Sequence, residues 1–190
     1  ALAIAPVLPA RAAAGAPGLA QWGVDQWSRE DGLAAAWVRD IVEGPDGFIW
    51  VATANGLSRF DGRRFRQFDA SRTAGLPSSG ISALAMDRDG ALWIGLEFGG
   101  LRVLRDGKVA TAAQANGFPD DVPVRVLLLD ASGTLWVATQ GGLWRIGPEG
   151  ATRVSPPVEA DAGVSVVALV RQGDAVLART RDHGLWLVQD

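Results

Sequence analysis

The sequence predicts an all-β fold built from β-propeller blades, which are antiparallel sheets of four short strands. Three observations predict it. A turn glycine followed three residues later by tryptophan recurs at a spacing of 43 residues. A Gly-Leu pair follows each tryptophan, and a Gly-Leu or Gly-Phe pair precedes each repeat. Because repeats of about 40–50 residues with four strands each are typical of propeller blades, we expect about four such repeats, as part of a larger propeller of seven blades.

The repeats align at their glycines and tryptophans. The turn glycines and their tryptophans are Gly47 with Trp50, Gly90 with Trp93, and Gly133 with Trp136. The Gly-Leu pairs lie at 56–57, 100–101, 142–143 and 184–185, and the preceding pairs at 32–33, 75–76 and 117–118. Three sets of positions in one register make a chance match very improbable.

Each repeat predicts four strands in order. The first is a continuous apolar run, as in 81–86 and 124–129, which is typical of a strand buried on both faces. An Asp-Gly or Ser-Gly turn then leads to the second strand, which carries the tryptophan. The third strand starts at the Gly-Leu pair, and a turn such as 61–62 leads to the fourth. No segment after residue 20 has a sustained helical period.

The recurrent tryptophan is interpreted as a packing residue. A blade must bury both faces against its neighbours, and one large aromatic side chain at a fixed place fills the wedge between successive blades. By buried area, each of the three tryptophans stabilises the fold by roughly 2–4 kcal/mol.

The repeats predict the boundaries of the chain. The fourth unit is degenerate, with Gly173 at the turn glycine and Val176 at the tryptophan position. In the N-terminal segment, Trp22 and Trp27 stand where Phe65 and Phe68 stand in the first repeat, which predicts a lone fourth strand that closes the ring. The expected units are a residual signal peptide or linker (1–20), an N-terminal closing strand (21–33), blades at 34–76, 77–119 and 120–160, and a degenerate partial blade (161–190).

Composition excludes several classes of function. The net charge is −3 without a basic cluster, which argues against nucleic-acid binding. The chain has no cysteine and one histidine, His183, so we expect no metal site and no cofactor. The Ala- and Pro-rich first 20 residues resemble the end of an export signal, with a flexible linker as the alternative. No run of about 20 apolar residues spans a bilayer, so contact with a membrane is expected only through segments outside this sequence.

The repeat resembles the two-component regulator propeller repeat of bacterial sensor proteins. Its core pattern, D-x-x-G-x-[LI]-W-[IV]-[GA]-T-x-x-G-[GL], is similar to "GPDGFIWVATANGL", "DRDGALWIGLEFGGL" and "DASGTLWVATQGGL". The resemblance covers 22–146 well and 164–188 weakly, and Leu96 departs from the pattern where Thr53 and Thr139 match it. It implies a periplasmic propeller, the extracytoplasmic part of an inner-membrane receptor, with a histidine kinase or diguanylate cyclase output outside this chain.

No set of residues indicates catalysis. His183 lies in a connecting loop without the serine nucleophile that a Ser-His-Asp arrangement needs. Binding is expected on the loops between the second and third strands and between successive blades, which share one face around the channel mouth. The ligand-binding candidates there are Trp37, Arg39, Asn55, Ser82, Glu97, Phe98, Arg125, Gln140 and His183.

These candidates suit a small polar ligand such as a saccharide, because they combine aromatic, amide, carboxylate and guanidinium groups. The alternative is that Trp37 and Phe98 pack beneath a loop. The leading hypothesis is a sensor module that binds a ligand or partner, without enzyme activity in this chain. The alternatives are a lyase-type propeller enzyme and a pure protein-interaction scaffold. An open arc of four blades exposes both end faces, so we expect closure by another copy or by the remainder of the receptor.

Overall fold

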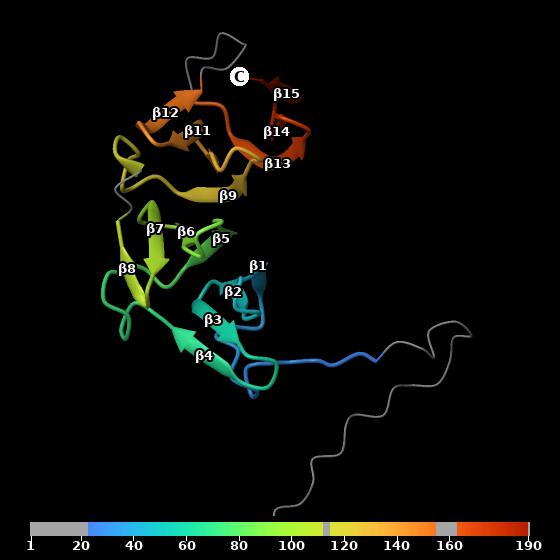
Figure 1. The fold of residues 1–190 in the computed structure, drawn as a ribbon, viewed down its shortest axis with the longest axis vertical. Helices are drawn as coiled ribbons and strands as arrows, with labels where there is room; N and C mark the ends of the chain where they lie inside the picture. Colours follow the sequence, from blue (N-terminus) through green and yellow to red (C-terminus); the bar gives the residue numbers. More distant parts are fainter. Residues whose placement is uncertain (1–22, 112–114, 155–162, 190) are drawn as a thin grey trace, which may run out of the picture.

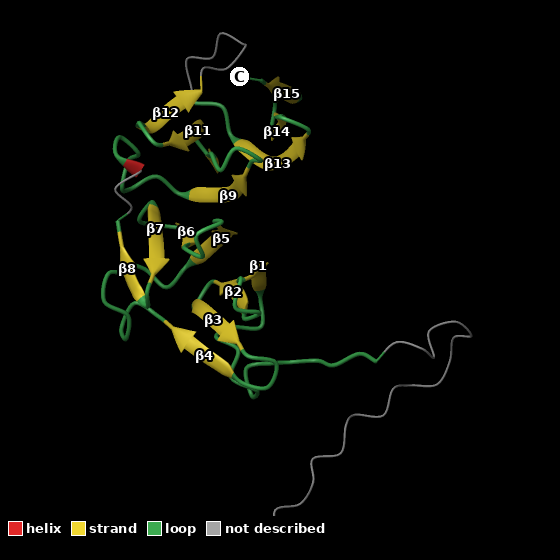
Figure 2. Ribbon diagram, in the orientation of Figure 1, coloured by secondary structure: helices red, strands yellow, loops and turns green. Residues whose placement is uncertain are grey.

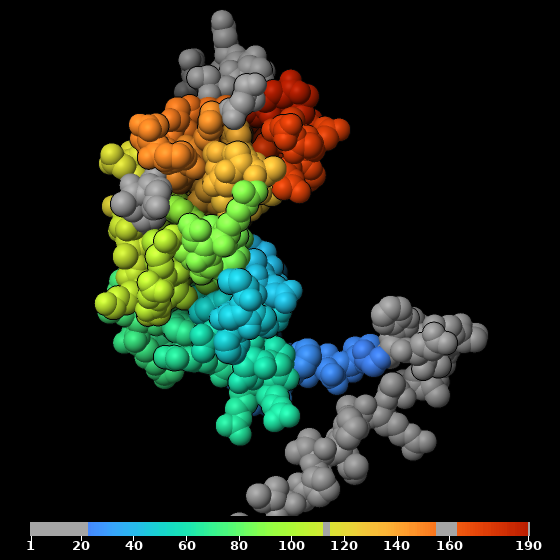
Figure 3. Space-filling view, viewed as in Figure 1, coloured from blue at the N-terminus to red at the C-terminus, as the bar shows by residue number. Residues whose placement is uncertain are grey.

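The structure is a computed structural model that describes residues 23–111, 115–154 and 163–189. Within these ranges the chain forms fifteen strands in four separate antiparallel sheets, arranged side by side in an open arc (Figures 1 and 3). The predicted all-β propeller fold is confirmed. The predicted leader or linker, residues 1–20, and Trp22 lie outside the described residues.

Each sheet is a simple up-and-down meander whose strands pair in chain order (Figure 2). The first sheet holds β1 (Val38–Glu43), β2 (Ile49–Thr53), β3 (Gly56–Phe60) and β4 (Phe65–Phe68). The second holds β5 (Ile81–Met86), β6 (Leu92–Leu96), β7 (Leu101–Arg105) and β8 (Lys108–Ala110). The third holds β9 (Val124–Leu129), β10 (Leu135–Thr139), β11 (Gly142–Gly147) and β12 (Gly150–Val154). The fourth has three strands, β13 (Val166–Gln172), β14 (Ala175–Thr180) and β15 (Leu185–Val188).

The first strand of each sheet lies on the concave side of the arc. Neighbouring sheets meet along these strands, β1 with β5, β5 with β9, and β9 with β13. The fourth strands β4, β8 and β12 lie on the convex side (Figure 1). The concave side is therefore the wall of the central channel of a propeller.

A separate apolar core fills each of the three junctions between sheets, and each core contains one repeat tryptophan. Trp50 lies with Leu57 and Ile81 between the first and second sheets. Trp93 lies between the second and third sheets, and Trp136 between the third and fourth. All three side chains are buried, so each tryptophan occupies the wedge between successive sheets.

Two recurrent hydrogen bonds fix the repeat. The indole N–H of Trp136 donates to Asp130 Oδ2 at 2.8 Å, and that of Trp93 donates to Asp87 Oδ2 at 3.3 Å. At the other end of the second strand, Thr139 Oγ1 donates to the carbonyl of Gly142 at 2.9 Å and accepts the N–H of the residue at 141. Thr53 and Thr180 form the same pair of bonds. These threonines therefore close the turn between the second and third strands.

In the fourth repeat, the residue at the tryptophan position lies one residue later than the sequence predicted. Thr180 takes the place of Thr139, and the residue three positions before it is Leu177, not Val176. The first hairpin of this sheet is one residue shorter, since Val170 pairs with Leu177 where the third sheet pairs Leu128 with Trp136. Val176 instead packs into the core shared with the third sheet.

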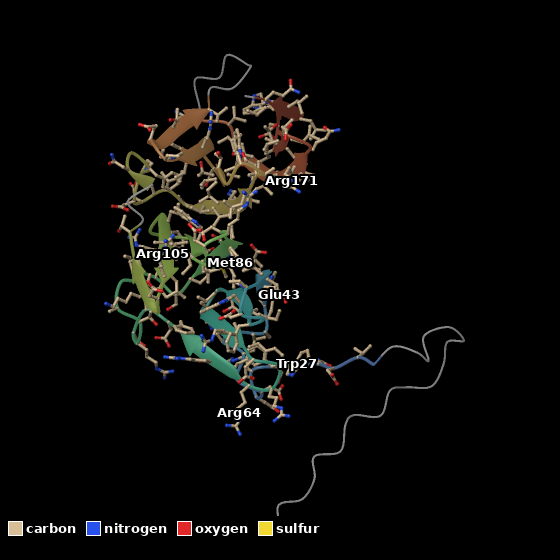
Figure 4. The ribbon with its side chains drawn as sticks, viewed as in Figure 1. Trp27, Glu43, Arg64, Met86, Arg105 and Arg171 are labelled. Atoms are coloured by element: carbon tan, nitrogen blue, oxygen red, sulfur yellow. The ribbon has the colours of Figure 1, made fainter. Side chains whose placement is uncertain are left out.

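The N-terminal segment covers part of the outer face of the first sheet. Leu33 and Ala35 are buried, and the Trp27 ring lies 4.9 Å from the Phe60 ring, edge to face (Figure 4). The N–H of the residue at 34 donates to Ser58 Oγ at 3.1 Å. Ile41, the cross-strand partner of buried Val51 on this face, is nevertheless 59% exposed. Residues 27–35 therefore cover only part of this end face, and its closure by another copy or by the remainder of the receptor stays a prediction.

The proposed closing strand stays a prediction. Residues 23–28 form no strand, and the free edge of β15 lies at the opposite end of the arc (Figure 1). The outer face of the fourth sheet is apolar and uncovered in the described part of the chain. It presents Val170, Leu177 and Leu187 in one cross-strand row, with Leu185 beside them.

Candidate ligand-binding face

A β-bulge occurs at the same place in the first strand of every sheet. The register with the second strand shifts between Val38 and Asp40, and at the matching positions in β5, β9 and β13. Each shift leaves one residue without a direct cross-strand partner. These bulge residues are Arg39, Ser82, Arg125 and Val167. Bulges redirect a side chain and are common beside functional sites. The bulges therefore direct three of the predicted ligand-binding candidates, Arg39, Ser82 and Arg125, along the concave side.

Arg39 and Glu97 form an ion pair that bridges the first and second sheets. Arg39 Nη2 lies 3.2 Å from Glu97 Oε2 and donates to Oε1 at 3.3 Å. The backbone N–H of Glu97 donates to the carbonyl of Gly80 at 2.9 Å, and a side chain at Gly80 would approach the Glu97 carboxylate at 3.1 Å. Glycine at 80 therefore leaves room for the carboxylate that the loop after β6 supplies.

Ser82 links the second and third sheets. Its hydroxyl lies 2.6 Å from the carbonyl oxygen of Val124 and 3.0 Å from that of Gly95. The Ser82 hydroxyl has one proton to donate, and two backbone carbonyl oxygens already lie within reach of it. Its main role is therefore to join the two sheets, and it has no proton left for a ligand. Asp40, which the sequence did not single out, has an equivalent role because its Oδ2 accepts the N–H of Leu84 at 2.8 Å.

Two buried polar atoms on this side have no hydrogen-bond partner in the structure, Arg125 Nε and Ser165 Oγ. Buried polar groups are nearly always hydrogen bonded, so such atoms need an explanation in water or a ligand. In the loop after β14, Arg181 donates its N–H to the carbonyl of Ser165, as Glu97 does to Gly80. An arginine therefore stands in the fourth sheet where a carboxylate stands in the second.

The two aromatic candidates are exposed and do not pack beneath a loop. Trp37 is 80% exposed and Phe98 is 68% exposed. Asn55, Gln140 and His183 are also exposed, each in the loop between the second and third strands of its sheet. None of the nine candidates lines any of five surface clefts of about 290–610 Å³ in the described part of the chain. The candidate site is thus an open surface along the arc.

The described residues contain no cluster of metal-ligating side chains. Among them, no three His, Asp or Glu side chains gather as a metal ion requires. The His183 imidazole has no hydrogen-bond partner in the described part of the chain, where only its backbone N–H is engaged, with Thr180. The described residues also contain no apolar helix of the length that a bilayer requires.

The fold and its recurrent contacts define a β-propeller of repeated blades with one tryptophan at each junction. The model of the two-component regulator propeller repeat matches residues 32–55 and 75–98, within the first and second repeats. The resemblance inferred from the sequence is confirmed on these two repeats. No curated protein sequence matches the chain at a significant level.

Solved structures share this fold. The extracellular domain of BT3049 from B. thetaiotaomicron, assigned as a hybrid two component system, aligns with a TM-score of 0.69 at 23% identity, over 88% of this chain and 23% of that one. The equivalent domain of BT4673 aligns with a TM-score of 0.65 at 24% identity, over 80% of this chain and 21% of that one. The chain therefore spans about a fifth of their length. Virginiamycin B lyase from Staphylococcus aureus aligns with a TM-score of 0.55 at 17% identity, over 80% of this chain and 55% of that one.

Proposed function

We propose that this chain is a sensor module of a bacterial signalling receptor and that its concave side binds a small polar ligand. The two-component regulator propeller repeats support the signalling role. The B. thetaiotaomicron structures, described as extracellular domains, support a position outside the cytoplasm. We place the module in the periplasm, with a histidine kinase or diguanylate cyclase output outside this chain.

The observation that carries the binding proposal is the row of bulge residues. A repeated bulge directs Arg39 and Arg125 along the concave side, and the Arg125 guanidinium retains a buried N–H with no acceptor. Exposed Trp37, just before β1, and Phe98, in the loop after β6, supply flat apolar surfaces. Hydrogen-bond donors beside exposed aromatic rings suit a saccharide, whose hydroxyl groups accept bonds while its ring packs on an aromatic face.

The proposal is tested with a thermal-shift screen of mono- and oligosaccharides on the whole chain. A ligand that binds only the native state raises the melting temperature in a concentration-dependent way. We expect Trp37→Ala and Arg125→Gln to abolish the shift without lowering the melting temperature of the free protein. The control is Arg88→Gln, on the first hairpin of the second sheet, outside the candidate set. Binding that survives both substitutions, or the absence of any saccharide shift, contradicts the proposed site.

A further inference from the structure

A second candidate site lies between the first and second sheets, beside the turns that follow β1 and β7. It is a cleft of about 290 Å³. Trp50 and Phe68 of the first sheet line it on one side, and Met86, Leu92 and Leu104 of the second sheet on the other (Figure 4 labels Met86). Ligand sites are mostly apolar concavities with a few placed polar groups, and these five side chains supply the apolar part.

Two arginines from the first sheet supply positive charge. Arg59 and Arg66 are direct cross-strand partners, and Arg59 is also the partner of Trp50, so the three side chains share one face. The Arg59 guanidinium lies 4.2 Å from the ring centre of Phe48, and that of Arg66 lies 5.1 Å from the ring centre of Phe68. In the described part of the chain, neither arginine forms an ion pair.

The first repeat also leaves an indole N–H unused. In the second and third repeats this group donates to an aspartate, as Trp136 does to Asp130. In the first repeat Gly44 stands at the aspartate position, and a side chain there would lie 3.5 Å from Trp50 Nε1. No described residue accepts a hydrogen bond from Trp50 Nε1.

The cationic pair is specific to this junction. In the second sheet the cross-strand partners that correspond to Arg59 and Arg66 are Val103 and Ala110. Val103 packs against the core between the second and third sheets. In the third sheet they are Arg145 and Thr152. An arginine at the position of Arg59 therefore recurs, and among the described sheets only the first has a second arginine beside it.

Two carboxylates complete the lining. Asp46 and Asp106 also line the cleft, are exposed, and form no ion pair with either arginine in the described structure. The lining thus offers two separate positive and two separate negative charges around an apolar wall. A simple anion would satisfy the arginines and meet repulsion from the aspartates, whereas a zwitterion has a partner for each of its charges.

We propose that this cleft binds an apolar α-amino acid. Its carboxylate would accept hydrogen bonds from Arg59, Arg66 and the Trp50 indole. Its ammonium group would lie at the aspartates, and its side chain against the apolar wall. This site is separate from the concave side, so the sensor proposal does not depend on it.

The test compares L-leucine and L-phenylalanine with 4-methylpentanoate, which lacks the amine, and 3-methylbutylamine, which lacks the carboxylate. Binding to the whole chain is measured by titration calorimetry and thermal shift. We expect at least one amino acid to bind saturably. We expect both analogues to bind roughly tenfold or more weakly, because each leaves one set of charges without a partner.

The variants are Arg66→Gln and Asp106→Asn. Asp106 has φ 51°, and asparagine tolerates this left-handed conformation, so the turn is kept. Each variant should weaken binding about tenfold or more, while Arg63→Gln, an exposed arginine on the same hairpin but outside the cleft, should leave it unchanged. The proposal is overturned if neither amino acid binds, if an analogue binds equally well, or if Trp37→Ala abolishes binding while Arg66→Gln does not.

Discussion

Replacing Asp130 by alanine should destabilise the protein by about 2–4 kcal/mol. Asp130 Oδ1 accepts the Ser132 hydroxyl at 2.6 Å, the Ser132 N–H at 2.9 Å and the Thr134 N–H at 3.0 Å, while Oδ2 accepts the Trp136 indole N–H at 2.8 Å. Ser132 is exposed, so its groups can bond to water instead. Thr134 and Trp136 are 8% and 4% exposed. The Trp136 indole N–H would be left without a partner, and the Thr134 N–H would keep only a long hydrogen bond of 3.4 Å to Ser132 Oγ. Each loss should cost about 1–2 kcal/mol.

The pH dependence of this loss has a defined sign. Burial raises the pKa of Asp130, but hydrogen bonds from Ser132, Trp136 and Thr134 outweigh it, so the pKa lies below the ordinary value of 3.8. A carboxyl whose pKa is lowered by folding stabilises the native state above its unfolded pKa, and this stability is lost as the pH falls through the folded pKa. The difference in the free energy of unfolding between wild type and Asp130→Ala should be constant at pH 5–7 and should become smaller below about pH 3.8.

The assay is urea unfolding of wild type and variant across this pH range, followed by tryptophan fluorescence. The matched control is Asp89→Ala. Asp89 is an exposed aspartate in the equivalent turn of the second repeat, and in the described structure its carboxylate accepts no hydrogen bond. Its loss should change stability by no more than about 0.5 kcal/mol. The reasoning is refuted if Asp130→Ala behaves like Asp89→Ala at pH 7, or if its effect is the same at pH 3 as at pH 7.

Three further predictions follow from other contacts, each measured by urea unfolding. Trp93→Ala leaves a cavity in a buried junction and should lower the free energy of unfolding by about 3–5 kcal/mol. Trp37→Ala, at an exposed position, should change it by less than about 0.5 kcal/mol. Equal losses would contradict the role of Trp93 as a packing residue between sheets. Thr139→Val removes a buried hydroxyl with two hydrogen bonds and should cost about 1–2 kcal/mol, and an unchanged stability would show that the turn closes without it. A double-mutant cycle on Arg39 and Glu97 should give a coupling below about 1 kcal/mol that decreases with salt, and a larger, salt-independent coupling would mean that the pair is shielded from water.

The blades could be predicted from the sequence because the physical requirement repeats. Every junction needs a turn and a wedge-filling side chain, so Trp50 and its counterparts recur in a register that a single sequence reveals. The error at Val176 arose where that regularity ends. The hairpin at Gly173 is one residue shorter and no tryptophan marks the place, so only strand pairing could show that Leu177 takes the position.

The sequence indicates which residues the candidate face contains, and their role in binding stays a prediction; the bulges that set their direction could not be predicted. The repeat pattern places Arg39 and Arg125 near a channel mouth, but the direction of their side chains depends on bulges in the strand register, which neither sequence pattern nor composition specifies. The same reasoning could not separate Ser82, whose hydroxyl meets two backbone carbonyls, from a residue free to bind. The role of Asp40 was missed because its partner, the N–H of Leu84, lies in the next sheet, 44 residues along the chain.

The leucine at the tryptophan position of the fourth sheet has a mechanical consequence. Leu177 fills less volume than tryptophan, so any sheet stacked on that face would gain roughly 1–2 kcal/mol less at its wedge than the three described junctions gain. In a row of sheets stabilised by nearest-neighbour contacts, separation begins at the weakest junction. Heat, force or a protease would therefore open the seam beside β13–β15 of a ring containing this sheet before the junctions at Trp50, Trp93 and Trp136.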